Sequence, residues 1–303
     1  MQPHVSKSSE RRFIISITLT SIILVAEVVG GIYANSLALL SDAAHVFMDI
    51  FALGLSFFAL RISARPSDDQ HTYGYHRVEV FASLINGLSL LAISTGIVIE
   101  AIDRLRNPLV VRTTEMLIIA VIGLVVNLVV AFVLGQKDEH AGHAQRKDLN
   151  VYSAFMHVIG DALSSVGVIA AGLVIAFTGA EWVDPAVSFL ISGVLLVSTY
   201  RILRSSLHIL IEGVPEGLSV AKIKTEISTL PSVQAVHDLH VWNICSGTVS
   251  LSAHVVMENT PGEDNSMTLK QINDMLEEKF DIEHTTIQME NSADTCAGGE
   301  GCN

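Results

Sequence analysis

Long apolar stretches alternate with short polar ones over the first two thirds of the chain. A helix needs roughly 20 apolar residues to cross the hydrocarbon core of a bilayer, and each of these stretches comes close to that length. They predict membrane-spanning helices at residues 13–33, 37–60, 79–101, 115–135, 151–177 and 185–203. We therefore expect a polytopic α-helical membrane domain with six transmembrane helices.

A different pattern begins after residue 205. Apolar residues recur at helical spacing at 219–230 and 266–280, and Ser219 is placed to cap the first of these helices. Three further segments alternate apolar with polar or small residues and predict strands, at residues 232–244, 248–258 and 284–290. The αββαβ order predicts a small α+β domain, with its helices on one face of a three-stranded sheet.

The distribution of charge follows the same division. The formal net charge is −13, but fifteen acidic side chains against four lysines lie from Ser206 onward, so the preceding part is nearly neutral. We divide the chain into an N-terminal segment, a six-helix membrane domain, an acidic domain and a tail, at residues 1–12, 13–205, 206–290 and 291–303. Three cysteines are too few for a disulfide framework, so we expect reduced thiols.

Basic residues near the ends of the spans predict the orientation of the chain. Lys7, Arg11 and Arg12 precede the first span, and Arg61 follows the second. The opposite side has few basic residues apart from one arginine-containing loop, residues 103–113. Because positive residues collect on the cytoplasmic side, we expect a multi-pass protein with both termini in the cytoplasm.

Four ionisable side chains interrupt two of the predicted spans. His45 and Asp49 are four residues apart, and His157 and Asp161 repeat that spacing, so each pair lies on one face of a helix. A carboxylate at mid-bilayer costs about 2.5–3.5 kcal/mol on insertion scales, so each acid needs a partner. Counting the spans makes the second and fifth antiparallel. We therefore expect His45 level with Asp161, and Asp49 level with His157.

Two imidazoles and two carboxylates at one depth would suit tetrahedral zinc. Histidine binds metal only when it is neutral, so metal release can be coupled to proton uptake at the same imidazoles. Alternating access around a site near the midplane is the architecture of a secondary transporter. The sequence has no G-x-x-x-x-G-K-[ST] motif, which argues against an ATP-driven pump.

Other polar residues in the spans show no comparable pairing. Asn86 and Asn127 are expected to form hydrogen bonds between helices. Asp42 is expected near the outer end of its span, where water can reach it. Glu27, in the first span, is ambiguous between a structural and a functional role.

Two other classes of function fit the sequence less well than transport. An intramembrane metalloenzyme would need an open metal position for water, whereas four ligands leave none, and no H-E-x-x-H motif is present. A membrane-anchored metal sensor would need no acids inside its spans. We therefore expect a transporter rather than an enzyme, and a protein that binds no nucleic acid.

Several motifs together resemble those of the cation diffusion facilitators. They are the paired H-x-x-x-D spacings, "RPSDDQHTYGYHRVEVFASL", "EAIDRLRNP", "HDLHVW" and "HTTIQME". Within this family, the sequence most resembles the bacterial zinc, cobalt and cadmium branch. The resemblance implies a homodimer in the lipid bilayer that exports Zn²⁺ from the cytoplasm in exchange for protons. It also implies that the paired histidines and aspartates are the transport site.

The resemblance implies two further metal sites. One would lie in the loop between the second and third spans, where this chain has Asp68, His71 and His76, with Tyr75 at a position where some members place a histidine. The other would be a regulatory zinc site in the cytoplasmic domain. Its candidate ligands are His237, His254, His284, Glu290, Cys296 and Cys302. His240, three residues after His237, is expected on the opposite face of its strand.

Overall fold

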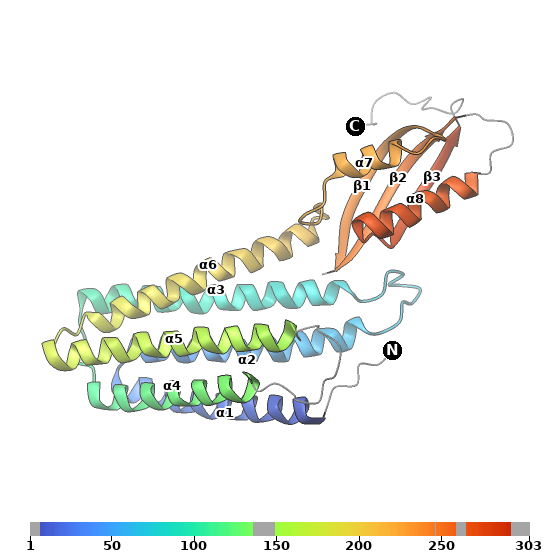
Figure 1. Ribbon diagram of the computed structural model, residues 1–303. Coiled ribbons are helices and arrows are strands. Elements are labelled where there is room, and N and C mark those ends of the chain that lie inside the picture. Colours follow the sequence, from blue (N-terminus) through green and yellow to red (C-terminus); the bar gives the residue numbers. More distant parts are fainter. Residues whose placement is uncertain (1–6, 136–148, 246, 259–264, 292–303) are drawn as a thin grey trace. The chain divides into compact units, whose positions relative to one another are not determined.

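The computed structural model describes residues 7–135, 149–245, 247–258 and 265–291, and their side chains except at 7–16, 133–135, 149–159 and 291. Its long helices are α1 (Lys7–Ala34), α2 (Leu37–Ser63), α3 (Arg77–Arg106), α4 (Thr113–Gly135), α5 (Leu149–Thr178) and α6 (Val183–Leu210), as drawn in Figure 1. All six are long and apolar enough to cross a membrane. The prediction of six spans is confirmed.

Contacts divide the chain into two compact units. The first comprises residues 1–55 and 85–201, and the second comprises residues 56–84 and 202–303. The boundary passes through α2, α3 and α6. The second unit therefore contains one end of each of these helices together with the αββαβ domain.

Small side chains hold the first unit together. Its helix α4 contacts both α1 and α5. A buried cluster that joins α1, α2, α4 and α5 includes Ala34, Ala38, Ala120 and Ala171. Lipid tails are as apolar as the helices themselves, so close approach of helix backbones, which small residues permit, has to supply the attraction.

The second unit contains the predicted α+β domain. Its elements are α7 (Val220–Ser228), β1 (Val233–Cys245), β2 (Thr248–Met257), α8 (Asn265–Phe280) and β3 (His284–Asn291). The strands form one sheet in the order β1-β2-β3, with β1 antiparallel and β3 parallel to β2. The Ser219 hydroxyl accepts a hydrogen bond from the backbone N–H of Lys222, so the predicted cap of α7 is confirmed.

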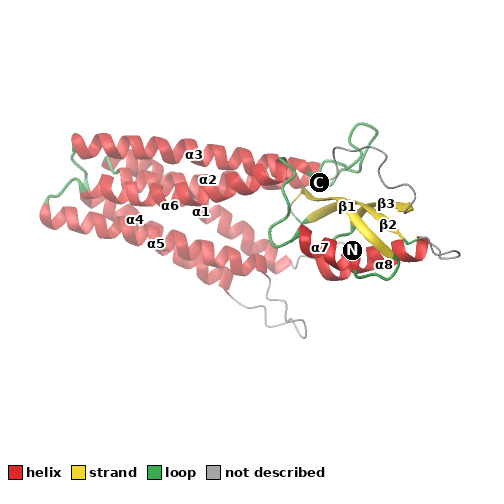
Figure 2. Cartoon of the chain, turned by 90° about the horizontal axis from the view of Figure 1, so that it is seen from above, coloured by secondary structure: helices red, strands yellow, loops and turns green. Residues whose placement is uncertain are grey.

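Both short helices cover the same face of the sheet, as Figure 2 shows. Ile223 and Ile227 of α7 and Ile272 and Leu276 of α8 are fully buried in one cluster with strand residues such as Leu251. Their spacing of four residues puts each pair on one face of its helix. The opposite face of the sheet is left free to carry polar side chains.

Candidate functional site

Three of the four predicted intramembrane ligands converge in the first unit. His45 Nε2 lies 3.2 Å from Asp161 Oδ1 and 3.6 Å from Asp49 Oδ2. One ligand atom from each residue can be chosen so that all three lie within 4.8 Å of one another. The contact between His45 and Asp161 that the antiparallel spans predict is therefore present.

His157 belongs to α5, one turn before Asp161. Its side chain lies outside the described residues, so its expected meeting with Asp49 stays a prediction. On a helix, residues four apart share a face.

Asp42 is buried, and the expectation that water reaches it is wrong. Asp42 is only 2% exposed to solvent. The Ser165 hydroxyl on α5 donates to Asp42 Oδ2 at 3.2 Å, and Asn127 Nδ2 on α4 donates to Ser165 Oγ at 3.5 Å. The spacing Asp42, His45, Asp49 follows one helix face, and this periodicity could have indicated that Asp42 faces inward with the other two.

A second cluster lies on the sheet. Glu290 Oε1 is 2.7 Å from His254 Nδ1, and Glu290 Oε2 is 3.1 Å from His237 Nε2. The strand register explains the cluster, because His237 pairs with His254 across the antiparallel strands and Gln288 pairs with His254 on the other side. Glu290 is two residues beyond Gln288 and therefore points to the same face.

The Glu290 carboxyl group gives this cluster a negative charge that favours a bound cation. Partial burial raises the pKa of Glu290, but hydrogen bonds from His254 and His237 outweigh it, so the pKa lies below its usual value. The carboxylate is therefore ionised at neutral pH. His237 Nδ1 is buried without a hydrogen-bond partner among the described residues. Two imidazoles and a carboxylate are a donor set that fits zinc better than calcium or magnesium.

Asp238 also lies beside this cluster. Its position was not predicted from the sequence. Its φ of +50° accompanies a register shift between His237 and His240. Asp238 Oδ1 lies 3.0 Å from His240 Nε2, and Oδ2 lies 3.7 Å from His254 Nε2. Aspartate tolerates a positive φ better than most residues. The shift also pairs His240 with Ser252, which returns it to the face of His254 and corrects the expectation that it lies opposite.

His284 does not join the cluster. It begins β3 opposite Ser250, six residues before Glu290, which is about 20 Å along a strand. It is exposed to solvent. The expectation that His284 contributes a ligand beside Glu290 is thereby corrected. The tail residues Cys296 and Cys302 lie outside the described residues.

The three loop candidates are not brought together. Tyr75 donates to Asp68 Oδ2 at 2.7 Å, and Asp68 Oδ1 is 3.2 Å from His71 Nδ1. The hydrogen bond from Tyr75, with others from the loop backbone, lowers the pKa of Asp68 to about 2. His76 instead contacts the Ser63 hydroxyl at 3.3 Å. Both oxygens of Asp68 thus hold the turn together, which corrects the expectation of a metal site shared by Asp68, His71 and His76.

Comparison with known families assigns both parts of the chain. Residues 13–211 match the cation efflux transmembrane domain, and residues 215–292 match the cytoplasmic domain of cation efflux proteins. The chain belongs to the cation efflux family. The expected membership of the zinc, cobalt and cadmium branch is confirmed by its relatives.

This cation efflux protein has similar relatives in several bacteria. It is 41% identical over 282 residues to the metal cation efflux system protein CzcD of Cupriavidus metallidurans, covering 93% of this chain and 87% of the relative. It is 40% identical over 292 residues to a cadmium, cobalt and zinc/H⁺-K⁺ antiporter of Bacillus subtilis, covering 96% and 92%. The solved metal-bound C-terminal domain of the Cupriavidus transporter is 40% identical and covers 24% of this chain and 99% of the domain, with a TM-score of 0.22.

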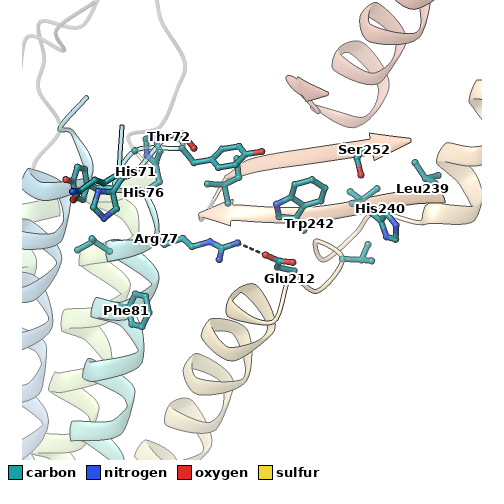
Figure 3. A pocket seen from close by; sticks show the side chains of 18 of the residues that line it. His71, Thr72, His76, Arg77, Phe81, Glu212, Leu239, His240, Trp242 and Ser252 are labelled. Atoms are coloured by element: carbon teal, nitrogen blue, oxygen red, sulfur yellow. Dashed lines mark hydrogen bonds and ion pairs between the residues drawn. The ribbon is translucent and has the colours of Figure 1, made fainter. Parts of the chain in front are cut away.

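The second unit of this cation efflux protein also contains a cavity of about 910 Å³. Figure 3 shows that its lining includes His76 just before α3, Arg77 and Phe81 near the start of α3, and Trp242 of β1. Arg77 Nη2 donates to Glu212 Oε1 at 3.0 Å. Both partners are exposed, and exposed ion pairs stabilise by only about 0–1 kcal/mol.

Proposed function

We propose that the chain exports zinc, and related divalent ions such as cadmium and cobalt, from the cytoplasm in exchange for protons. The observation that carries this proposal is the convergence of His45, Asp49 and Asp161 inside helices that can span a membrane. His157 is the fourth proposed ligand. Intramembrane ionisable groups mark ion pathways, because burying them without a partner is too costly. The names of the relatives support the choice of ions.

The same atoms can bind either a metal ion or a proton. His45 lies between two carboxylates. A protonated imidazole there pairs with both acids, whereas a neutral imidazole offers its nitrogen to a metal ion. Metal and protons therefore compete for one set of atoms. Alternate exposure of this set to the two sides of the membrane converts the competition into exchange.

The setting of this transport is also part of the proposal. The protein is a homodimer in the cell inner membrane with both termini in the cytoplasm. The match to the family's cytoplasmic domain supports this orientation. Its activity is transport rather than catalysis, since four protein ligands leave no open coordination position for a reactive water.

Reconstitution of the full chain tests the transport proposal. Proteoliposomes containing the wild type are expected to move zinc only when zinc or proton gradients are imposed, and to move protons in the opposite direction. Fluorescent zinc and pH indicators inside the vesicles would follow both fluxes. Zinc movement that leaves the internal pH unchanged would contradict exchange, and no zinc movement at all would contradict export.

We further propose that His237, His254 and Glu290 form a regulatory zinc site in the cytoplasmic domain, with Cys296 and Cys302 of the tail as additional ligands. Zinc would neutralise the Glu290 carboxylate and join β1, β2 and β3. That bond across three strands would stiffen the sheet. The domain would thereby make transport responsive to cytoplasmic zinc.

Two histidines on the same sheet provide a matched test of this site. His254→Ala is expected to lower the number of zinc ions bound by the purified full chain and to weaken the response of transport to low zinc. Flux at saturating zinc should remain, because the transport ligands are intact. His284→Ala, the control, should bind zinc like the wild type. Equal losses of zinc in the two variants would contradict the assignment.

A further inference from the structure

Two buried carboxyl groups of the first unit are outside the proposed metal ligands and each have an oxygen without a hydrogen-bond donor among the described residues. Glu27 of α1 is 1% exposed and Asp42 of α2 is 2% exposed. Glu27 Oε2 and Asp42 Oδ1 are each buried without a hydrogen-bond partner among the described residues. An unpaired buried charge is costly enough that such a group becomes neutral instead. The arrangement therefore suggests that one of these acids holds a proton.

The charged groups that act on Glu27 belong to α2 and α5. Asp42 on α2 and Asp161 on α5 act on Glu27 with negative charge. Asp161 and His45 act on Asp42. Helix α4 contributes Gly123 beside Glu27, and its only charged residue, Glu115, lies in its first turn. Glu27 thus feels the charge of two acids on other helices, and its own helix carries none of the proposed metal ligands.

The hydrogen bonds indicate which of the two acids is neutral. Asn127 donates to Ser165, and Ser165 donates to Asp42. A chain of donors that ends on a carboxylate stabilises its ionised form. Glu27 Oε2 has no such donor among the described residues. Glu27 is therefore the better holder of a proton, and Asp42 the better anion.

The packing around Glu27 favours a proton over a metal cation. A Cβ added at Gly123 would lie 2.7 Å from Glu27 Oε1, so the carboxyl group packs directly against the backbone of α4. Hard metal cations require a shell of several oxygen ligands. A proton requires no such space.

We propose that Glu27 carries one of the protons exchanged for metal, as a neutral acid while the transport site is free of metal. This inference rests on the proposed function. When a divalent ion binds His45, Asp49 and Asp161, its positive charge stabilises the Glu27 anion. The O–H bond of Glu27 then breaks, the electron pair stays on the carboxylate, and the proton leaves to water on the side to which the site is open. Release of the metal reverses the step.

Proton release on zinc binding tests the proposal. Zinc is added to purified full-length protein in weakly buffered detergent solution, and released protons and bound zinc are both measured. Glu27→Gln is expected to bind as much zinc as the wild type while losing one released proton per transport site. Glu115→Gln removes a carboxylate elsewhere in the same unit and should match the wild type in both measurements.

If Glu27→Gln folds poorly, infrared spectra of the wild type and of a second variant still test the proposal. In wild-type protein, infrared difference spectra should show the carbonyl band of a protonated carboxyl group disappearing when zinc binds. Gly123→Ala, which changes no charge but pushes on Glu27 Oε1, should shift that band.

Several results would overturn the inference while leaving the proposed function intact. They are unchanged proton release in Glu27→Gln, absence of the carboxyl band in the wild type, or loss of bound zinc in Glu27→Gln, which would make Glu27 a metal ligand. A potassium dependence of transport that vanishes in Glu27→Gln, with unchanged proton release, would also overturn it. A wild type that moves no zinc would overturn the proposed function and this inference together.

Discussion

Zinc flux is expected to fall to background when Asp161 is replaced by alanine, and likewise for Asp49. Asp161 contributes a carboxylate oxygen 3.2 Å from His45 Nε2, inside the membrane domain. Its loss removes a metal ligand and also leaves His45 without one of its acidic partners. Changing only the outer partners of metal ligands lowers metal affinity by about 10–100-fold. Loss of a ligand should therefore lower transport by at least ~100-fold at limiting zinc.

The measurement is zinc uptake into proteoliposomes under a fixed pH gradient, with equal amounts of inserted protein. Asp103→Ala is a suitable control, because Asp103 is an exposed aspartate on α3 whose side chain accepts a hydrogen bond from Asn107. This variant should transport like the wild type. Undiminished proton-coupled uptake by both Asp49→Ala and Asp161→Ala would refute the assignment of the transport site.

The predictable part of the site depended on helical spacing. A separation of four residues fixes a shared helix face whatever the surroundings, so His45 and Asp49 could be placed together from the sequence. The order of the spans then gave the relative direction of α2 and α5. These two facts were sufficient to predict that His45 meets Asp161, which the 3.2 Å contact confirms.

Depth within a span was less predictable than the face of the helix. Asp42 is five residues after the start of α2, so its position along the chain suggested contact with water. Its burial depends on Ser165 and Asn127, which belong to two other helices. Burial of this kind arises from packing between helices distant in the sequence, and the pattern of one helix does not contain it.

The sheet shows the same limit in another form. His237, His254 and Glu290 could be proposed as one group because alternation fixes the face of each residue. The irregularity at Asp238 could not be predicted in this way. An extra residue in one strand reverses the face of every later residue in that strand. That shift reversed the expected side of His240. His284 failed for a simpler reason, since sharing a strand with Glu290 does not mean being near it.

Asp184 binds the start of α2 from the first turn of another helix. It is fully buried at the beginning of α6. Its oxygens accept hydrogen bonds from the Ser36 hydroxyl at 2.6 Å and from the backbone N–H groups of Leu37 and Ala38 at 2.7 and 3.2 Å. The first N–H groups of a helix have no partner within it, and burial of Ser36, Leu37 and Ala38 keeps water from supplying one. Asp184 therefore acts as a cap for α2 supplied by α6.

Asp184→Ala is expected to destabilise the protein by roughly 2–4 kcal/mol, because buried donors left without an acceptor cost about 1–3 kcal/mol each. Asp184→Asn keeps one acceptor oxygen and should lose clearly less. Thermal unfolding of the purified variants in detergent would compare them. His45 lies about two turns into α2. Loosening the start of that helix should therefore also weaken zinc binding at low temperature, where the variant is still folded. Equal melting temperatures for Asp184→Ala and the wild type would show that α2 does not depend on this cap.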